Sequence, residues 1–183
     1  MYPVIGEPAK KMGVMRMYQA GEKVVSGIHG VCLVADRETR TVDRKQVTYL
    51  VLEPVGQTGA RFLVPAHNAA AMAKVHRLLT KEELEALVAS GEVRADAWIQ
   101  DENRRKQTYR ELIGSGDRVR LMCMIRTLYR HREARRAEGR KCHISDENFL
   151  RDAERLVSGE ISVVLGYDQA QTKAYLKERL IDA

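Results

Sequence analysis

A change of hydrophobic pattern near Pro65 divides this chain into two parts. Before Pro65, short apolar runs lie at residues 23–25, 30–34, 47–52 and 61–64. Glycine-containing turns and a polar stretch at 36–46 separate these runs, and no helical period intervenes. Four or five short strands in about fifty residues predict a small Tudor- or SH3-like β-barrel.

After Pro65 the apolar residues follow a helical period. Thr80 is a predicted N-cap, Gly91 a predicted stop, and Asp168 the predicted cap of a last helix. The predicted helices cover residues 81–90, 95–112, 117–138, a segment beginning at Ser145, and a final segment ending at Leu180. The fold class is therefore α+β, a β-barrel followed by an all-helical domain.

The predicted limits follow from these patterns. Residues 1–16 contain two prolines and no sustained period, and we expect a disordered leader there. We assign residues 17–70 to the β module and residues 71–183 to the helical domain. No apolar run is long enough to span a bilayer, and no signal-peptide core is present at the N-terminus. A cytoplasmic protein without membrane contact is expected.

The chain lacks the motifs of catalytic and metal sites. Its three cysteines, Cys32, Cys123 and Cys142, fit no zinc spacing, even with His143 beside the last of them. Phosphate-binding loops, dinucleotide fingerprints and hydrolase or metalloprotease signatures are missing. The sequence predicts no enzyme, no cofactor, no metal and no small-molecule substrate.

Positive charge is concentrated in one stretch. The chain carries a net charge of +6, and residues 104–141 hold 13 Lys/Arg against 4 Asp/Glu. Residues 17–90 are nearly balanced, with 9 against 8. A local excess of this kind favours contact with a polyanion, although a solvated helix face explains it equally well.

The predicted helix at 117–138 carries most of this charge. Arginine predominates there, and its planar fork suits bidentate contact with phosphate. Binding through phosphates would depend on salt and be largely independent of base sequence. The basic residues of the preceding predicted helix at 95–112, including Arg110, could extend the same surface. The candidate nucleic-acid contacts from the two helices are Arg104, Arg105, Lys106, Arg126, Arg130 and Arg132.

The single tryptophan, Trp98, lies just upstream of this basic stretch among polar neighbours. A lone tryptophan most often anchors a core. Beside a basic surface, an exposed aromatic ring can instead stack on bases or wedge between them. The residues alone leave both interpretations open.

Several segments together resemble a known family. Residues 18–66, with GEKVV, HGVCLVADRETRTV, TYLVL and VPAHNA, resemble the RNA-polymerase-interacting domain of CarD-type bacterial transcription regulators, which the transcription-repair coupling factor shares. The later tryptophan, the RRK cluster, SGD, IRTLY and the helix after Ser145 resemble the helical domain of the same family. The helicase motifs of the coupling factor are missing, which favours the stand-alone regulator.

The resemblance implies that the barrel binds the β-subunit lobe of RNA polymerase. Arg40 matches the family's polymerase-contacting arginine. A second arginine of the family corresponds here to Leu63, and Arg61, two residues earlier on the same strand face, is the candidate to replace it. The Tyr-Pro pair common after the first strand is Ser26-Gly27 here.

The resemblance also implies that the helical domain contacts promoter DNA at the upstream edge of the melted region, where a tryptophan enters the minor groove and stabilises the open complex. Some members place that tryptophan where this chain has Glu102. Trp98 lies four residues earlier, about one helical turn, which would keep it on the same face.

Three hypotheses follow. The leading one is a nucleoid-associated transcription regulator that binds RNA polymerase and clamps promoter DNA without reading its sequence. The second is a general RNA- or ribosome-associated binding module that uses the same arginines. The third is a protein adaptor whose arginines pair with acidic partners or with the chain's own acidic C-terminal segment.

Overall fold

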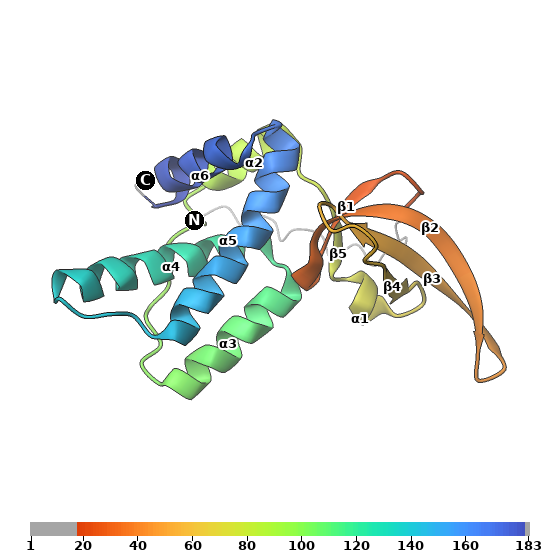
Figure 1. The fold of residues 1–183 in the computed structure, drawn as a ribbon, viewed down its shortest axis with the longest axis horizontal. Helices are drawn as coiled ribbons and strands as arrows, with labels where there is room; N and C mark the ends of the chain where they lie inside the picture. Colours follow the sequence, from red (N-terminus) through yellow and green to blue (C-terminus); the bar gives the residue numbers. More distant parts are fainter. Residues whose placement is uncertain (1–17, 182–183) are drawn as a thin grey trace, which may run out of the picture.

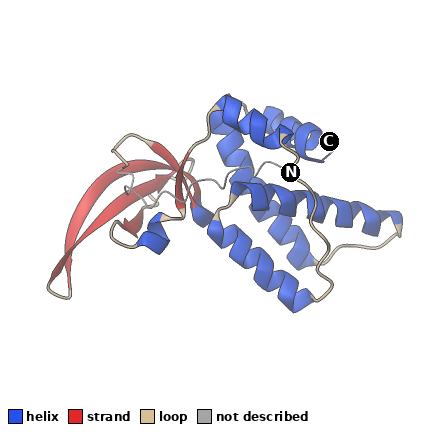
Figure 2. Cartoon of the chain, turned by 180° about the vertical axis from the view of Figure 1, so that it is seen from behind, coloured by secondary structure: helices blue, strands red, loops and turns tan. Residues whose placement is uncertain are grey.

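The computed structural model describes residues 18–181, so the predicted leader lies outside the described residues. An antiparallel sheet and a group of helices form two modules that lie side by side (Figure 1). Figure 2, which colours helices blue and strands red, shows the same separation from behind. The predicted α+β class and the order of the two modules are confirmed.

The sheet has five strands in the order β4-β3-β2-β1-β5, all paired antiparallel. The strands are β1 (Lys23–Ser26), β2 (Gly30–Val42), β3 (Lys45–Pro54), β4 (Phe62–Pro65) and β5 (Val75–Arg77). A short 3₁₀ turn, η1 (Gly27–His29), joins β1 to β2, and α1 (Ala69–Met72) precedes β5. The sheet curves around a core of Tyr18, Val24, Cys32, Val34, Leu50, Leu52 and Val75.

Strands β2 and β3 form one long hairpin that extends away from the helices (Figure 1). The polar stretch at 36–46, predicted to be a connection, is instead paired from Asp36↔Val51 to Val42↔Lys45. Asp43 and Arg44 both have positive φ, 49° and 64°, as a two-residue primed hairpin turn requires. Ladder hydrogen bonds hold this part of the hairpin, and its side chains are polar because they meet little of the core.

Strand β5 was not predicted, because three residues are too short to show a period. It pairs with β1 through Val24↔Arg77 and Ser26↔Val75. The sheet therefore runs to Arg77, seven residues beyond the predicted limit at 70.

The helices are α2 (Lys81–Ala89), α3 (Glu102–Ser115), α4 (Arg118–Ala137), α5 (Ile144–Leu165) and α6 (Gln169–Leu176), followed by the π-helical turn η2 (Lys177–Ile181). The predicted caps are confirmed at Thr80, which forms a capping box with Glu83, and at Asp168, whose side chain accepts an N–H bond. Asp117 caps α4 in the same way. The core of this module includes Leu121, Met124, Ile125, Leu128, Leu150, Leu156 and Ile161.

One helix differs from its prediction. Residues 95–101 are not helical, and α3 begins only at Glu102. Asp101 is extended, with φ −68° and ψ 118°, and its side chain accepts from the backbone N–H of Arg104. This cap fixes the start of the helix at a position where composition alone allowed an earlier start.

The two modules are joined by a tight contact and by polar bonds. A Cβ on Gly116 would lie 3.1 Å from the Cα of Gly27, so the backbone segments around these two glycines approach closely. Glu160 accepts from the backbone N–H of Leu79 at 3.1 Å and from Arg118 Nε at 2.7 Å. Arg118 also donates to the carbonyl of Arg77. The end of β5 is thus bound to α4 and α5.

Candidate interaction surfaces

The three residues predicted to contact polymerase lie on one face of the sheet. Leu50 and Leu52 of β3 are buried in the core, so the alternate residues of β3 face outward. Val51 pairs with Leu63 and Val47 pairs with Arg40, and directly paired residues share a face. Arg61, two residues before Leu63, continues the same alternation. The structure therefore brings together Arg40, Arg61 and Leu63.

Both arginines of this face are exposed and held by neighbouring carboxylates. Arg40 donates to Glu38 through Nε at 2.9 Å and through Nη2 at 3.0 Å. Arg61 Nε donates to Glu53 at 2.8 Å. The hydrogen bonds from Arg40, with the positive charges of Arg40 and Arg61, lower the pKa of Glu38. These exposed ion pairs orient the two guanidinium groups. Because exposed pairs contribute little free energy, a partner's carboxylates could replace Glu38 and Glu53 at low cost.

Leu63 adds an exposed apolar side chain to this face, on the edge strand β4. Its side chain is 36% exposed, whereas Val51 opposite it is 4% exposed. An exposed leucine on the same face as two arginines can bury apolar area against a partner while the arginines bind carboxylates. This combination suits a protein partner better than a nucleic acid.

The second surface is built around the segment 91–101, which lies along α4. Arg126 Nη1 donates to the carbonyl of Val93 at 2.8 Å, and the backbone N–H of Asp96 donates to Thr127 Oγ1 at 2.8 Å. Cys123 Sγ contacts the carbonyl of Glu92 at 3.4 Å. These α4 residues are one turn apart or less, so one face of the helix fixes the segment.

Trp98 is partly buried where this segment reaches His131. The two rings stack with centroids 3.5 Å apart and planes at 8°. The Arg105 guanidinium carbon lies 4.5 Å from the centroid of the Trp98 ring. Trp98 is therefore neither a fully buried anchor nor a free side chain, but a ring held in a fixed orientation at the surface.

Arg105, a predicted contact with DNA, is instead buried in the helical module. Only 3% of its side chain is exposed. It donates to both carboxylate oxygens of Asp146, at 3.0 and 3.1 Å, and to the carbonyl of Ile99 at 2.8 Å. Arg105 lies on the inner face of α3, one turn before Tyr109 and two turns before Ile113, both buried. This residue supports Trp98 from within.

Trp98 is not related to Glu102 by one helical turn, as was predicted, because no helix connects residue 98 to Glu102. Its place beside the basic surface comes from the segment 91–101 and from the stack with His131. The sequence offered no signal for His131 or Asp146 in this role, since their partners are distant along the chain.

The predicted arginine surface divides into two. Arg126 and Arg130 are four residues apart on the α4 side that carries Trp98, and Arg130 is exposed there. Arg104 is exposed on α3, while Lys106 pairs with Glu102 along the same helix. Arg132 lies elsewhere, with its guanidinium 4.1 Å from the centroid of the Tyr129 ring and 3.8 Å from Glu147.

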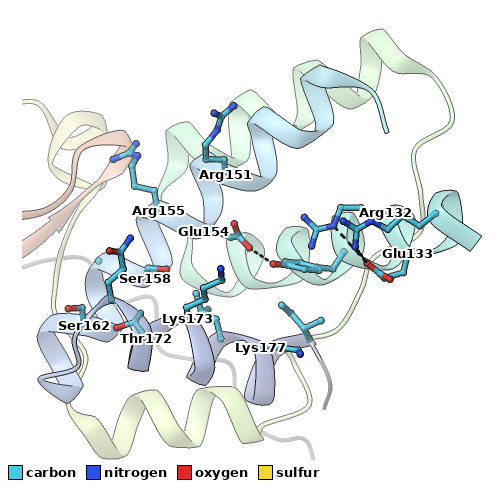
Figure 3. A pocket seen from close by; sticks show the side chains of 16 residues that line it. Arg132, Glu133, Arg151, Glu154, Arg155, Ser158, Ser162, Thr172, Lys173 and Lys177 are labelled. Atoms are coloured by element: carbon cyan, nitrogen blue, oxygen red, sulfur yellow. Dashed lines mark hydrogen bonds and ion pairs between the residues drawn. The ribbon is translucent and has the colours of Figure 1, made fainter. Parts of the chain in front are cut away.

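Arg132 belongs to a groove between α4, α5 and α6 that sequence reasoning did not identify. Figure 3 shows it with Arg151 and Arg155 on α5 and Lys173 and Lys177 near the C-terminus. These cations occur in a segment that is acidic overall, and only their four-residue spacing could have indicated a shared face.

Within residues 18–181, no group of three or more histidine, cysteine, aspartate or glutamate side chains is arranged to hold a metal ion. The same residues include no helix that is long and apolar enough to cross a membrane.

Comparison with family models agrees with the division of the chain. Residues 18–76 match the CarD-like/TRCF RID domain, and residues 84–177 match the CarD C-terminal domain. The gap between the matches, residues 77–83, spans the end of β5 and the start of α2. These domains imply transcription regulation through interaction with RNA polymerase, in a family that is generally not enzymatic. The chain therefore belongs to the family of CarD-type transcription factors.

Proposed function

We propose that this protein binds the β-subunit lobe of RNA polymerase with the outer face of β2, β3 and β4. Arg40, Arg61 and Leu63 form the contact. The observation that carries the proposal is that these three residues are exposed and share one face of the sheet.

The helical module then contacts promoter DNA at the upstream edge of the melted region and stabilises the open complex. Trp98 meets the bases, and Arg104, Arg126 and Arg130 contact phosphates, with Lys106 at the edge of the surface. The rigid stack of Trp98 on His131 supports this role, because a ring that is already oriented loses little entropy on inserting beside a base step.

The hydrogen bonds between the two modules would let binding at one module position the other. Arg118 and Glu160 bind the end of the sheet to the helices, so a polymerase bound at one module holds the other in a defined position. Tethering raises the effective concentration of the DNA-contacting surface at the promoter. Weak, sequence-independent DNA contacts are then sufficient.

Capture of the isolated β-lobe by the full-length protein tests the polymerase contact. We expect Arg40→Glu to weaken capture at least tenfold, since the charge reversal places a carboxylate where the guanidinium stood. Arg37→Glu is the matched control, because Arg37 is exposed three residues away on the opposite face of β2. Equal capture by the two variants would contradict the assignment of the polymerase contact to the face that carries Arg40.

The proposal also implies a location. RNA polymerase and promoter DNA coincide in the bacterial cytoplasm, so the tethered regulator is expected at the nucleoid. Loss of nucleoid fluorescence in a tagged Arg40→Glu protein is the corresponding observation in cells.

A further inference from the structure

The groove between α4, α5 and α6 has a volume of about 1100 Å³. Figure 3 shows side chains from all three helices around it. Among the described lining residues, six are cationic and two are carboxylates. The six cations are Arg132, Arg136, Arg151, Arg155, Lys173 and Lys177.

These cations are arranged as three pairs with four-residue spacing. One pair belongs to α4, one to α5, and one begins in α6 and ends in η2. Residues four apart lie on the same side of a helix, so each segment places two cationic residues along the groove. Three such pairs around one concave surface are more than solubility alone requires, and they produce a focused positive potential.

The two carboxylates of the groove already have partners. Glu154 accepts from the hydroxyl of Tyr129 at 2.7 Å, and Glu133 accepts from Arg136 at 3.2 Å. Glu154 keeps its charge, so the lining residues of α5 carry two cations against one carboxylate, and those of α6 and η2 carry two cations and no carboxylate. The groove therefore keeps a net positive charge along its α5 and α6 walls.

Arg132 supplies a second indication of an anion. Its Nε is buried and has no hydrogen-bond partner among the described residues, although the group stacks on Tyr129. The nearest carboxylates, Glu147 at 3.8 Å and Glu133 at 4.0 Å, lie beyond hydrogen-bond distance, and 22% of the Arg132 side chain is exposed, so its accessible nitrogens remain for an anionic oxygen in the groove. Arginine favours phosphate oxygens through its forked geometry.

The dimensions favour an extended strand over a single small anion. The α5 wall runs from Arg151 to Ser162, about 16 Å at 1.5 Å per residue. A strand with phosphates every few ångströms places several charges along that length. A flexible single strand can follow a concave wall of this length, whereas a duplex is stiff over it, with a persistence length of about 50 nm.

The lining offers little for recognition of bases. Tyr129 is covered by Arg132, and the hydroxyls of Ser162 and Thr172 donate to backbone carbonyls of their own segment. Sequence-tolerant binding of single strands normally adds free aromatic faces, which are missing from the described lining. Contact through phosphates alone is what remains.

We propose that the α4–α5–α6 groove binds the phosphate backbone of single-stranded nucleic acid without sequence preference. This site is separate from the Trp98 surface, and it does not depend on the proposed polymerase and promoter contacts. Arg155, at its edge, also donates to the carbonyl of Ile28 at 3.2 Å, so one rim of the groove touches the sheet module.

Fluorescence anisotropy of a labelled oligothymidylate with the full-length protein, in the absence of polymerase, tests the proposal. The test variant is Lys173→Glu with Lys177→Glu, both exposed, and the control is Lys45→Glu with Lys81→Glu, which changes the net charge equally at exposed sites outside the groove. We expect the groove variant to lose at least tenfold in affinity at low salt and the control to lose less than threefold. The slope of log K against log salt should fall by about 0.7 for each phosphate contact removed.

Three results would overturn the proposal. One is equal affinity of the groove and control variants. Another is displacement of the labelled strand by polyglutamate as effectively as by unlabelled oligothymidylate, which would assign the groove to acidic protein segments. The third is a tenfold loss for Arg130→Glu with no loss for the groove variant, which would place all single-strand binding at the Trp98 surface. If the glutamate variant unfolds, Lys173→Gln with Lys177→Gln gives the same comparison without charge reversal.

Discussion

Arg105 and Asp146 are 41 residues apart in the chain and form a bidentate ion pair that is 3% and 2% exposed. The pair joins α3 to the first turn of α5, and the same guanidinium lies against Trp98. Arg105, which the sequence predicted to contact DNA, is thus a buried residue that supports Trp98 from the interior.

Removing one partner of this pair should destabilise the protein strongly. Asp146→Ala leaves a buried guanidinium without its carboxylate, and losses of about 3–5 kcal/mol are typical of such changes. We expect that decrease in the free energy of unfolding from urea denaturation. Replacing both partners, Arg105→Met with Asp146→Leu, should restore part of it. A stable Arg105→Ala protein that binds DNA less tightly would contradict the buried role.

Substitution of Gly116 should weaken the junction between the modules. Gly116 has φ +68°, and a Cβ there would meet the Gly27 backbone at 3.1 Å. Gly116→Ala therefore combines backbone strain of about 1–2 kcal/mol with a steric clash. Gly139→Ala is the control, because Gly139 also has φ +68° but nothing lies within 4 Å of its Cβ position. Thermal unfolding should show a larger decrease in melting temperature for Gly116→Ala than for Gly139→Ala. Equal decreases would show that the close contact with Gly27 contributes little to stability.

Trp98 fluorescence should report the protonation of His131. Burial lowers the pKa of His131 below its ordinary 6.5, and the positive charges of Arg105, Arg135 and His143 act in the same direction against the opposing effect of Asp146. A lowered pKa means that the folded state binds the proton less readily than the unfolded state. Stability contributed by neutral His131 is therefore complete above about pH 6.5 and is lost as the pH falls through the folded pKa.

Because Trp98 is the only tryptophan, its emission isolates this event. We expect a transition with a midpoint below pH 6.5 that disappears in His131→Gln. A midpoint at or above 6.5 would contradict the buried stack.

Loss of the Trp98 ring should affect the open complex more than the fold. The ring is only partly buried, so Trp98→Ala should cost about 1–2 kcal/mol of stability, less than a fully buried tryptophan. The half-life of promoter open complexes in the presence of the protein should shorten severalfold. A melting temperature that collapses, with no well-folded protein left, would make Trp98 a core residue.

Arg130→Ala should act on the same complex through charge alone. Loss of one phosphate contact lowers binding to promoter DNA of any sequence and reduces the salt slope by about 1. Arg140→Ala, at an exposed position beyond the end of α4, is the control of equal charge. An equal effect of both would assign the loss to net charge.

The sequence by itself determined the order of the two modules and most element boundaries in the helical part. Thr80, Asp117 and Asp168 cap helices that begin where predicted, because a cap and the N–H groups it binds lie within three residues of each other. The sheet was predicted where apolar residues meet the core. The outer part of the β2–β3 hairpin was not, because its side chains are polar on both faces.

Only the tertiary structure decided which charges are available to a partner. Arg105 and Arg104 are neighbours in sequence, yet one is buried against Asp146 and the other is exposed. The arginines of α4 divide between the Trp98 surface and the groove because their direction depends on what α3, α5 and α6 cover. Burial of a charge depends on partners from distant segments, and a local pattern of residues does not contain that information.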